Sequence, residues 1–235
     1  LGLLALAAGW ASYWLGAQRP WMALIGTLCV LFGHAVILAV EFVLLALVHR
    51  DDPTPRASPS QLLRAWWGEV CTAPRVFFWR QPFRATAEQD LLPAAATSPR
   101  GVLLVHGFFC NRGLWNPWMR QLRELGVPFV AVNLEPIFGD IGDYADAIED
   151  AMRRLERHTR LPPVVVAHSM GGLAVRAWLA DQACGDRVWR VVTIGTPHQG
   201  TWLARFGHTR NGRQMRQGNA WLASIAAVSG AERYV

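Results

Sequence analysis

The sequence predicts an α/β fold, a parallel sheet flanked by helices, preceded by two apolar helices. Two observations support this prediction. The first 50 of the 235 residues contain three charged side chains, Arg19, Glu41 and Arg50. From residue 101 onward, short aliphatic runs alternate with segments of helical periodicity. Short strands that are buried on both faces and separated by helices are typical of a parallel sheet with right-handed crossovers.

The composition narrows the range of functions. The net charge is +6, and all 23 basic residues are Arg. This bias, together with abundant Ala, reflects coding composition more than a nucleic-acid surface, so no nucleic-acid partner is expected. The cysteines are tens of residues apart and indicate neither a disulfide framework nor a zinc site. They are Cys29, Cys71, Cys110 and Cys184.

Residues 1–50 are predicted to form two transmembrane helices. Apolar runs cover residues 1–16 and 21–48, and Gln18-Arg19-Pro20 separates them. A bilayer core needs about 20 apolar residues in a helix. The second run is long enough to span it, and the first would be long enough if further residues preceded Leu1. Three tryptophans around the break suit an aromatic belt at the headgroups. The alternative, a cleaved signal peptide, lacks a basic segment and does not account for two runs.

The charges around the second run predict an orientation. Arg50, Arg56 and Arg64 follow this run, whereas Arg19 alone lies in the turn, so the positive-inside tendency places the large domain in the cytoplasm. His34 and Glu41 fall on roughly one face of the run. A proton-relay role is one interpretation, and a neutral histidine with a glutamate packed near the helix end is the other.

Residues 51–98 are predicted to be a linker followed by an amphipathic segment. The first ten are rich in Pro, Asp and Ser, which is typical of a linker. Apolar residues then recur at helical spacing from Leu62 to Val70 and include Trp66 and Trp67. This face suits a helix in the headgroup region or one packed on the following domain, and both interpretations stay open.

The partial α/β domain is assigned to residues 99–235. Residues 101–105 form the first predicted strand, followed by a helix over 114–125 that Gly126 closes. Residues 129–132 form the second strand, and a helix over 141–155 has early acids and late bases that complement its dipole. Strands over 163–167 and 188–194 enclose a helix over 171–180. Ligands bind such sheets at the carboxyl ends of the strands, so the chemistry is expected there.

A serine lies between the third strand and its helix, in the segment Ala167-His168-Ser169-Met170-Gly171-Gly172. Small residues must flank Ser169 in such a sharp turn, because the turn strains its backbone and brings the next helix against the strand. The turn raises the hydroxyl above the sheet and directs free N–H groups of the helix at the group it attacks. This pattern is a nucleophile elbow, in which Ala167 replaces the first Gly of G-x-S-x-G.

Three motifs, VHGF, AHSMGG and IGTPHQGT, occur in an order and spacing that resemble the α/β-hydrolase superfamily. Within it, they look most like bacterial triacylglycerol lipases and esterases, over about residues 100–235. The resemblance implies an α/β-hydrolase-type sheet, with Ser169 as nucleophile and the backbone N–H groups of Phe108 and Met170 as oxyanion hole. The implied supporting residues are His106, Gly107, His168 and Gly171.

The resemblance further implies hydrolysis of an acyl ester or lipid through an acyl-enzyme, at a bacterial inner membrane and without a cofactor or metal. The histidines near Ser169 are not expected to be its base. His168 points away from the hydroxyl, His106 stabilises the oxyanion loop, and His198 shapes the loop after the last strand.

The family orders its triad as serine, acid and histidine, and this order is not completed after Ser169. Asp181 and Asp186 fall at the opposite edge of the sheet, and Glu232 has no histidine after it. The expected explanation is truncation at both ends, with the last strands and the triad partners beyond Val235. The chain as it stands is then expected to be inactive.

Residues 201–229 contain short apolar patches around an Arg-rich segment, 207–217. They predict a cap over an acyl pocket with an apolar wall, or ordinary core helices. The wall would comprise Phe108, Phe109, Trp115 and Trp118. The function predicted is therefore that of a membrane-anchored serine esterase or lipase. The alternatives are a thioesterase, amidase or acyltransferase of the same fold, and an inactive hydrolase-like membrane scaffold.

Overall fold

The computed structural model describes residues 2–48, 55–92, 100–182 and 185–226. These residues form two compact units, Leu1–Trp79 and Arg80–Val235, referred to below as unit 1 and unit 2. Arg50, Cys184, Glu232 and the end of the predicted cap lie outside the described residues.

Unit 1 begins with a helical hairpin of α1 (Gly2–Gly16) and α2 (Pro20–Val48). Gln18 makes the turn with a φ of 59°, and the Trp10 indole donates to the carbonyl of Met22 at 2.8 Å. By length and composition, α2 is the one described helix that could cross a membrane. The 15 residues of α1 are fewer than the roughly 20 that a bilayer core requires. The structure thus contains both predicted helices and one candidate span.

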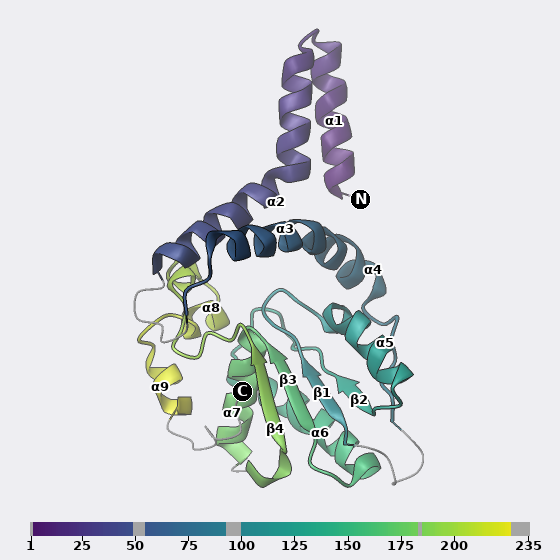
Figure 1. Ribbon diagram of the computed structural model, residues 1–235, viewed down its shortest axis with the longest axis vertical. Coiled ribbons are helices and arrows are strands. Elements are labelled where there is room, and N and C mark those ends of the chain that lie inside the picture. Colours follow the sequence, from purple (N-terminus) through teal and green to yellow (C-terminus); the bar gives the residue numbers. More distant parts are fainter. Residues whose placement is uncertain (1, 49–54, 93–99, 183–184, 227–235) are drawn as a thin grey trace. The chain divides into compact units, whose positions relative to one another are not determined.

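Helix α3 (Pro59–Arg75) follows, and a short π-helix (Val76–Arg80) continues it. Ser58 caps α3 in a capping box with Gln61. The first part of α2 runs beside α1 and its second part beside α3 (Figure 1). The Trp66 indole donates to Ala35 O at 2.9 Å, and His34 Nε2 to Val70 O at 3.2 Å. His34 therefore fastens two helices, which supports its structural interpretation.

Unit 2 contains a four-stranded parallel sheet in the order β2-β1-β3-β4 (Figure 1). The strands are β1 (Val102–Val105), β2 (Phe129–Ala131), β3 (Val164–His168) and β4 (Arg190–Ile194). In register, Leu104 lies opposite Val166 on one side and Ala131 on the other. The predicted parallel sheet is confirmed, and β3 occupies an interior position in it.

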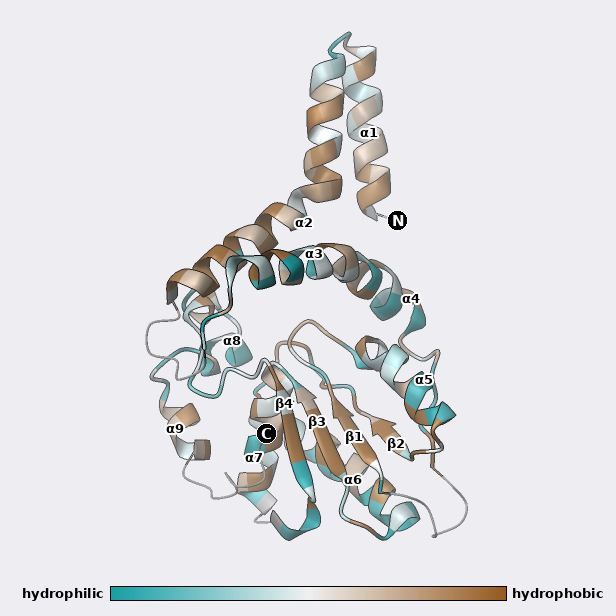
Figure 2. Ribbon diagram, viewed as in Figure 1, coloured by the Kyte–Doolittle hydropathy of each residue, from teal (hydrophilic) through white to brown (hydrophobic). Residues whose placement is uncertain are grey.

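Side chains alternate between two hydrophobic cores, one on each face of the sheet. Leu103, Val165 and Val191 join one core with side chains of α6 (Ala145–Thr159) and α7 (Met170–Gln182). Leu104 and Val166 join the other with Met119 of α5 (Asn116–Glu124). Figure 2 shows most of the length of the four strands in the hydrophobic colour. Because side chains on both faces of the sheet are buried, the sequence of the strands consists mostly of consecutive aliphatic residues.

Several element boundaries differ from the sequence prediction. Short 3-10 turns, Arg112–Trp115 and Gly142–Tyr144, precede α5 and α6. The Arg-rich segment 207–217, expected only to separate apolar patches, contains α8 (Arg210–Gln214). The Asn211 amide there donates to Ile137 O at 2.7 Å, and the side chain of Gln214 accepts from Ile141 N at 2.9 Å. Helix α8 is held by buried polar contacts. Because hydrophobic periodicity does not indicate such contacts, the sequence did not predict this helix.

Unit 2 also contains the short helices α4 (Gln81–Arg84) and α9 (Ala220–Ala226) and a 3-10 turn (Trp202–Phe206). Ala204, Met215, Leu222 and Ile225 belong to the core that contains α6 and α7. Leu203 and Phe206 are exposed. The assignment of a cap to this region stays a prediction.

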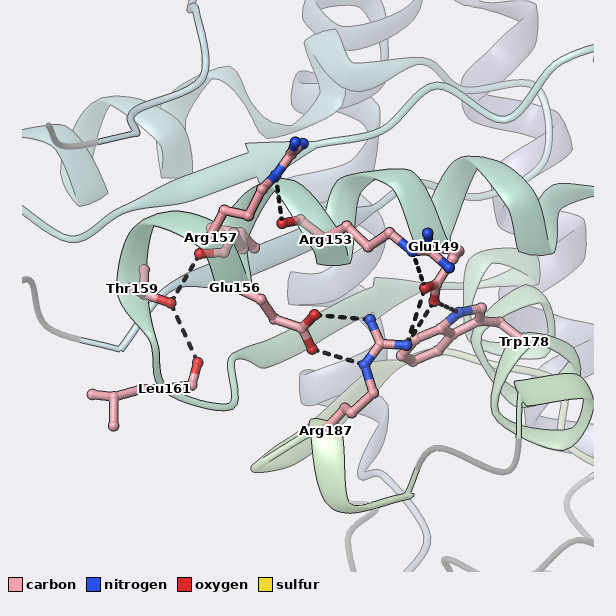
Figure 3. A network of polar contacts seen from close by, with 9 residues as sticks. Glu149, Arg153, Glu156, Arg157, Thr159, Leu161, Trp178 and Arg187 are labelled. Atoms are coloured by element: carbon pink, nitrogen blue, oxygen red, sulfur yellow. Dashed lines mark hydrogen bonds and ion pairs between the residues drawn. The ribbon is translucent and has the colours of Figure 1, made fainter. Parts of the chain in front are cut away.

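A charged network fastens α7 to α6 (Figure 3). Arg187, in a 3-10 turn (Gly185–Arg187), donates to Glu149 at 3.0 Å and to Glu156 at 2.8 Å. Glu149 also accepts from Arg153 at 2.6 Å and from the Trp178 indole at 2.9 Å. Burial alone would raise the pKa of Glu149, but these hydrogen bonds lower it to about 2. The pKa of Arg187 is raised, chiefly by its hydrogen bond with Glu156.

Candidate active site

Ser169 lies in the turn where β3 ends at His168 and α7 begins at Met170. Its φ is 51°, in the left-handed region that a residue with a Cβ atom rarely occupies. The Ser169 N–H donates to Ile194 O at 2.8 Å, which links the turn to the end of β4. The side chain is half-buried at the carboxyl edge of the sheet. This is the sharp turn that the motif predicts.

Two glycines let the loop after β1 approach Ser169. A Cβ atom on Gly107 would lie 2.8 Å from the Cβ atom of Ser169. One on Gly171 would lie 2.4 Å from the carbonyl oxygen of His106. The loop that carries the Phe108 amide therefore packs against the start of α7, which carries the Met170 amide. The first N–H groups of a helix have no intrahelical acceptor, so this end of α7 is suited to hold negative charge.

Thr196 supports the turn, although sequence reasoning assigned it no separate role. Its hydroxyl donates to Ser169 O at 2.9 Å, and Gly172 N donates to the same carbonyl at 3.0 Å. A Cβ atom on Gly172 would lie 2.2 Å from the Thr196 hydroxyl oxygen. The Gly-Thr-Pro sequence that directly follows β4 marked a loop at this edge of the sheet. The sequence could not show that Thr196 donates to Ser169, because that contact depends on how β4 packs beside β3.

His106 is buried under the loop and is held by two hydrogen bonds. Its Nε2 accepts from Leu134 N at 3.0 Å, so the proton lies on Nδ1, which donates to Gly107 O at 2.9 Å. Burial, with a smaller contribution from His168, lowers the pKa of His106 to about 4. A neutral imidazole with both nitrogens engaged positions the loop and is not arranged to accept the serine proton.

The two other histidines near the turn also have lowered pKa values. Burial lowers the pKa of His168, and its Nδ1 atom is buried without a hydrogen-bond partner among the described residues. Burial and then Arg176 lower the pKa of His198. Arg176 donates to His198 O at 3.1 Å, and the Thr193 hydroxyl lies 3.2 Å from His198 Nε2. The contacts of His198 tie the loop after β4 to α7 and β4.

An aromatic cluster follows the loop. The ring centroid of Phe108 lies 4.4 Å from that of Phe109, and both approach Phe138, at 6.1 and 5.4 Å. Phe109 is 58% exposed and Phe138 is 50% exposed. Trp115, expected in the same apolar wall, is 3% exposed and lies in the core with Met119. Phe138 takes part in this surface, although no sequence motif pointed to it.

The remaining acidic candidates lie away from the turn. Asp181 is in the last turn of α7, and Asp186 is in the 3-10 turn before β4, so both precede the amino end of that strand. Ser169 follows the carboxyl end of β3. Among residues that the structure describes, no group of three His, Cys, Asp or Glu side chains could hold a metal ion.

The chain is similar to a known protein family and to several solved structures. A model of the alpha/beta hydrolase family matches residues 102–233. A search of curated proteins finds no match. Two similar solved structures are the mature form of lipase BlEst2 from Bacillus licheniformis, 19% identical with a TM-score of 0.49, and its propeptide form, 17% identical with a TM-score of 0.52. Lipase B from Aspergillus fumigatus is 18% identical, with a TM-score of 0.51.

The matches cover 58%, 62% and 58% of this chain, in the order given. They span 61%, 36% and 36% of the lipase chains, so this chain corresponds to part of the length of each. For the two matches with TM-scores of 0.52 and 0.51, the likeness at these identities is one of fold.

Proposed function

Because the chain belongs to the alpha/beta hydrolase family, we propose that it is a membrane-anchored serine hydrolase that cleaves acyl esters through Ser169. The observation that carries this proposal is the strained turn at Ser169, against which the Gly107 backbone packs. Strain of this kind costs on the order of 1–3 kcal/mol and is concentrated at functional sites. A half-buried serine hydroxyl at the start of a helix, beside the loop after β1, suits acyl transfer.

In the proposed reaction, Ser169 Oγ attacks the ester carbonyl carbon while a general base takes its proton. The N–H groups of Phe108 and Met170 stabilise the oxyanion, the alcohol leaves, and water then hydrolyses the acyl-enzyme. The hydrogen bonds of His106 and His198 support a general base other than these two histidines. The exposed rings of Phe109 and Phe138 favour a substrate with an apolar acyl group.

The proposed membrane anchor is the hairpin of unit 1. Helix α2 has the length and composition of a span, and α1 packs along its first part. Anchoring would hold the hydrolase domain beside substrates that partition into the bilayer.

Labelling with a fluorophosphonate probe tests the nucleophile in the full-length protein. We expect the wild type to be labelled and Ser169→Ala to lose the label, with ester turnover reduced roughly 10⁴-fold or more. Ser224→Ala, which removes an exposed hydroxyl in α9, is the matched control and should label like the wild type. An unlabelled wild type would favour the inactive scaffold and overturn the enzymatic proposal.

Matched acyl donors separate the reaction classes. We expect the purified protein to hydrolyse p-nitrophenyl acyl esters faster than the corresponding thioesters and anilides. Faster turnover of a thioester or an anilide would keep Ser169 as nucleophile but reassign the substrate.

A further inference from the structure

An apolar groove lies between α2 and α3, within unit 1. Its volume is about 400 Å³, within the range of pockets that hold small ligands. All of its lining residues are apolar, and they include Ala39 and Val43 of α2 and Leu62, Leu63 and Trp66 of α3. The groove therefore offers a ligand hydrophobic contact and no polar side chain.

The packing of the two helices explains why the groove is open. Hydrogen bonds from Trp66 to Ala35 O and from His34 to Val70 O fasten α2 and α3 at one end of the groove. Beyond this end, α2 presents the small side chains of Ala39 and Ala46 beside the first two turns of α3. Methyl groups at these positions leave a space that larger side chains would fill.

The surroundings of α2 indicate what fills this space. The α2 side of the groove, residues 39–46, lies within the candidate membrane span Pro20–Leu47. Val43 is 58% exposed and Leu63 is 62% exposed, so the groove opens to the medium around that helix. Ordered water needs 2–4 polar partners, which an apolar lining does not supply, whereas a hydrocarbon chain needs none.

We infer that this groove binds one acyl chain of a bilayer phospholipid. Residues 39–46 extend over about 10 Å at 1.5 Å per residue, which matches a segment of an acyl chain. Outside the groove, α3 exposes Arg64 and Glu69, which are suited to the headgroup region. The inference rests on the membrane anchoring in the proposed function, but it does not depend on the reactivity of Ser169.

Photocrosslinking tests the inference with the full chain in vesicles of phosphatidylethanolamine and phosphatidylglycerol. The vesicles contain a phosphatidylcholine with a diazirine in its acyl chain, and flotation first establishes that the protein is bound. Trypsin cuts after Arg56, Arg64 and Arg75, so Leu62 and Leu63 are recovered in one peptide and Trp66 in the next. We expect lipid adducts on both peptides.

Paired variants locate the adducts. Ala39→Trp places an indole in the groove and should lower crosslinking about tenfold, because the space is then occupied. Ala65→Trp adds the same side chain at an exposed position of α3 outside the groove and should match the wild type. Leu63→Gln makes the exposed rim polar and should also lower crosslinking, which keeps the test informative if Ala39→Trp misfolds.

Three outcomes would overturn the inference. Equal crosslinking in Ala39→Trp and Ala65→Trp would place the lipid elsewhere. Absence of lipid adducts from both α3 peptides of a protein that floats would show that no acyl chain occupies the groove. Failure to float would refute the anchoring itself, and fluorophosphonate labelling of Ser169 would show separately whether the enzymatic proposal holds.

Discussion

At the scale of single residues, the conformation of Ser169 is the clearest sign of function. Its positive φ is maintained because the N–H bonds Ile194 and the carbonyl accepts from both Gly172 and Thr196. Three hydrogen bonds fix a conformation that a residue with a Cβ atom would otherwise avoid. The strain is thus held by the first turn of α7 and by the end of β4 with the loop that follows it.

This strain predicts different stabilities for two variants that both lack the hydroxyl. Ser169→Gly should be more stable than Ser169→Ala by about 1 kcal/mol, because glycine adopts a positive φ without a steric cost. The free energy of unfolding of unit 2, measured in urea, distinguishes them. Equal stability, or a more stable alanine variant, would contradict the strained conformation.

At the scale of elements, the network of Glu149, Glu156, Trp178 and Arg187 joins α6, α7 and the turn before β4. Glu149 is 8% exposed, and its carboxylate accepts from three side chains. The network fastens α7, and Met170, whose amide is proposed for the oxyanion hole, lies at the first turn of the same helix. Disrupting the network should therefore lower the free energy of unfolding of unit 2.

We expect Glu149→Ala to destabilise unit 2 by about 3 kcal/mol, because Arg187 and Trp178 lose a buried partner. Asp146→Ala removes an exposed carboxylate from the same helix and should cost about 0.5 kcal/mol or less. Urea unfolding of the two variants measures the difference. A similar cost for both would show that the network does not stabilise the fold.

The stability of unit 2 should fall as the pH is lowered, because two of its buried groups have lowered pKa values. The pKa of Glu149 falls from 4.5 to about 2 on folding, so the stabilisation is complete above pH 4.5 and is lost as the pH falls through 2. The pKa of His106 falls from 6.5 to about 4, so its neutral form stabilises the fold above pH 6.5, and this stabilisation is lost as the pH falls through 4. The Glu149→Ala variant should therefore still lose stability between pH 6.5 and 4, where His106 is protonated. It should lack the further loss between pH 4.5 and 2 that protonation of Glu149 causes in the wild type.

At the scale of the whole molecule, the distribution of Arg around α2 determines the expected side of the membrane. Arg56 and Arg64 follow α2, and Arg19 lies in the turn before it. Positive charge is retained in the cytoplasm, so unit 2 is expected there. A protease added to intact spheroplasts should leave unit 2 uncut and should digest it after lysis. Digestion in intact spheroplasts, with a cytoplasmic marker protected, would reverse the orientation.

Much of the fold could be predicted from local pattern. Most strand residues of unit 2 are apolar and lie against one of the two cores, so aliphatic runs located the strands and indicated a parallel sheet. The 3-10 turn before α5 and the short helix α8 were missed, because polar contacts determine both. The Asn111 side chain caps that turn by accepting from Gly113 N at 2.9 Å, and Gln214 reaches Ile141 from α8.

The sequence by itself determined where the elbow lies. A strand, a serine two residues after Ala167 and two before Gly171, and a second glycine at 172 are all local features, and together they predict a sharp turn. Tertiary structure alone decided that His106 bonds Leu134, that Arg187 reaches Glu149 and that α3 packs on α2 through Trp66. These partners are 28, 38 and 31 residues apart. Contacts at such separations depend on how elements pack, which the periodicity of a single segment does not encode.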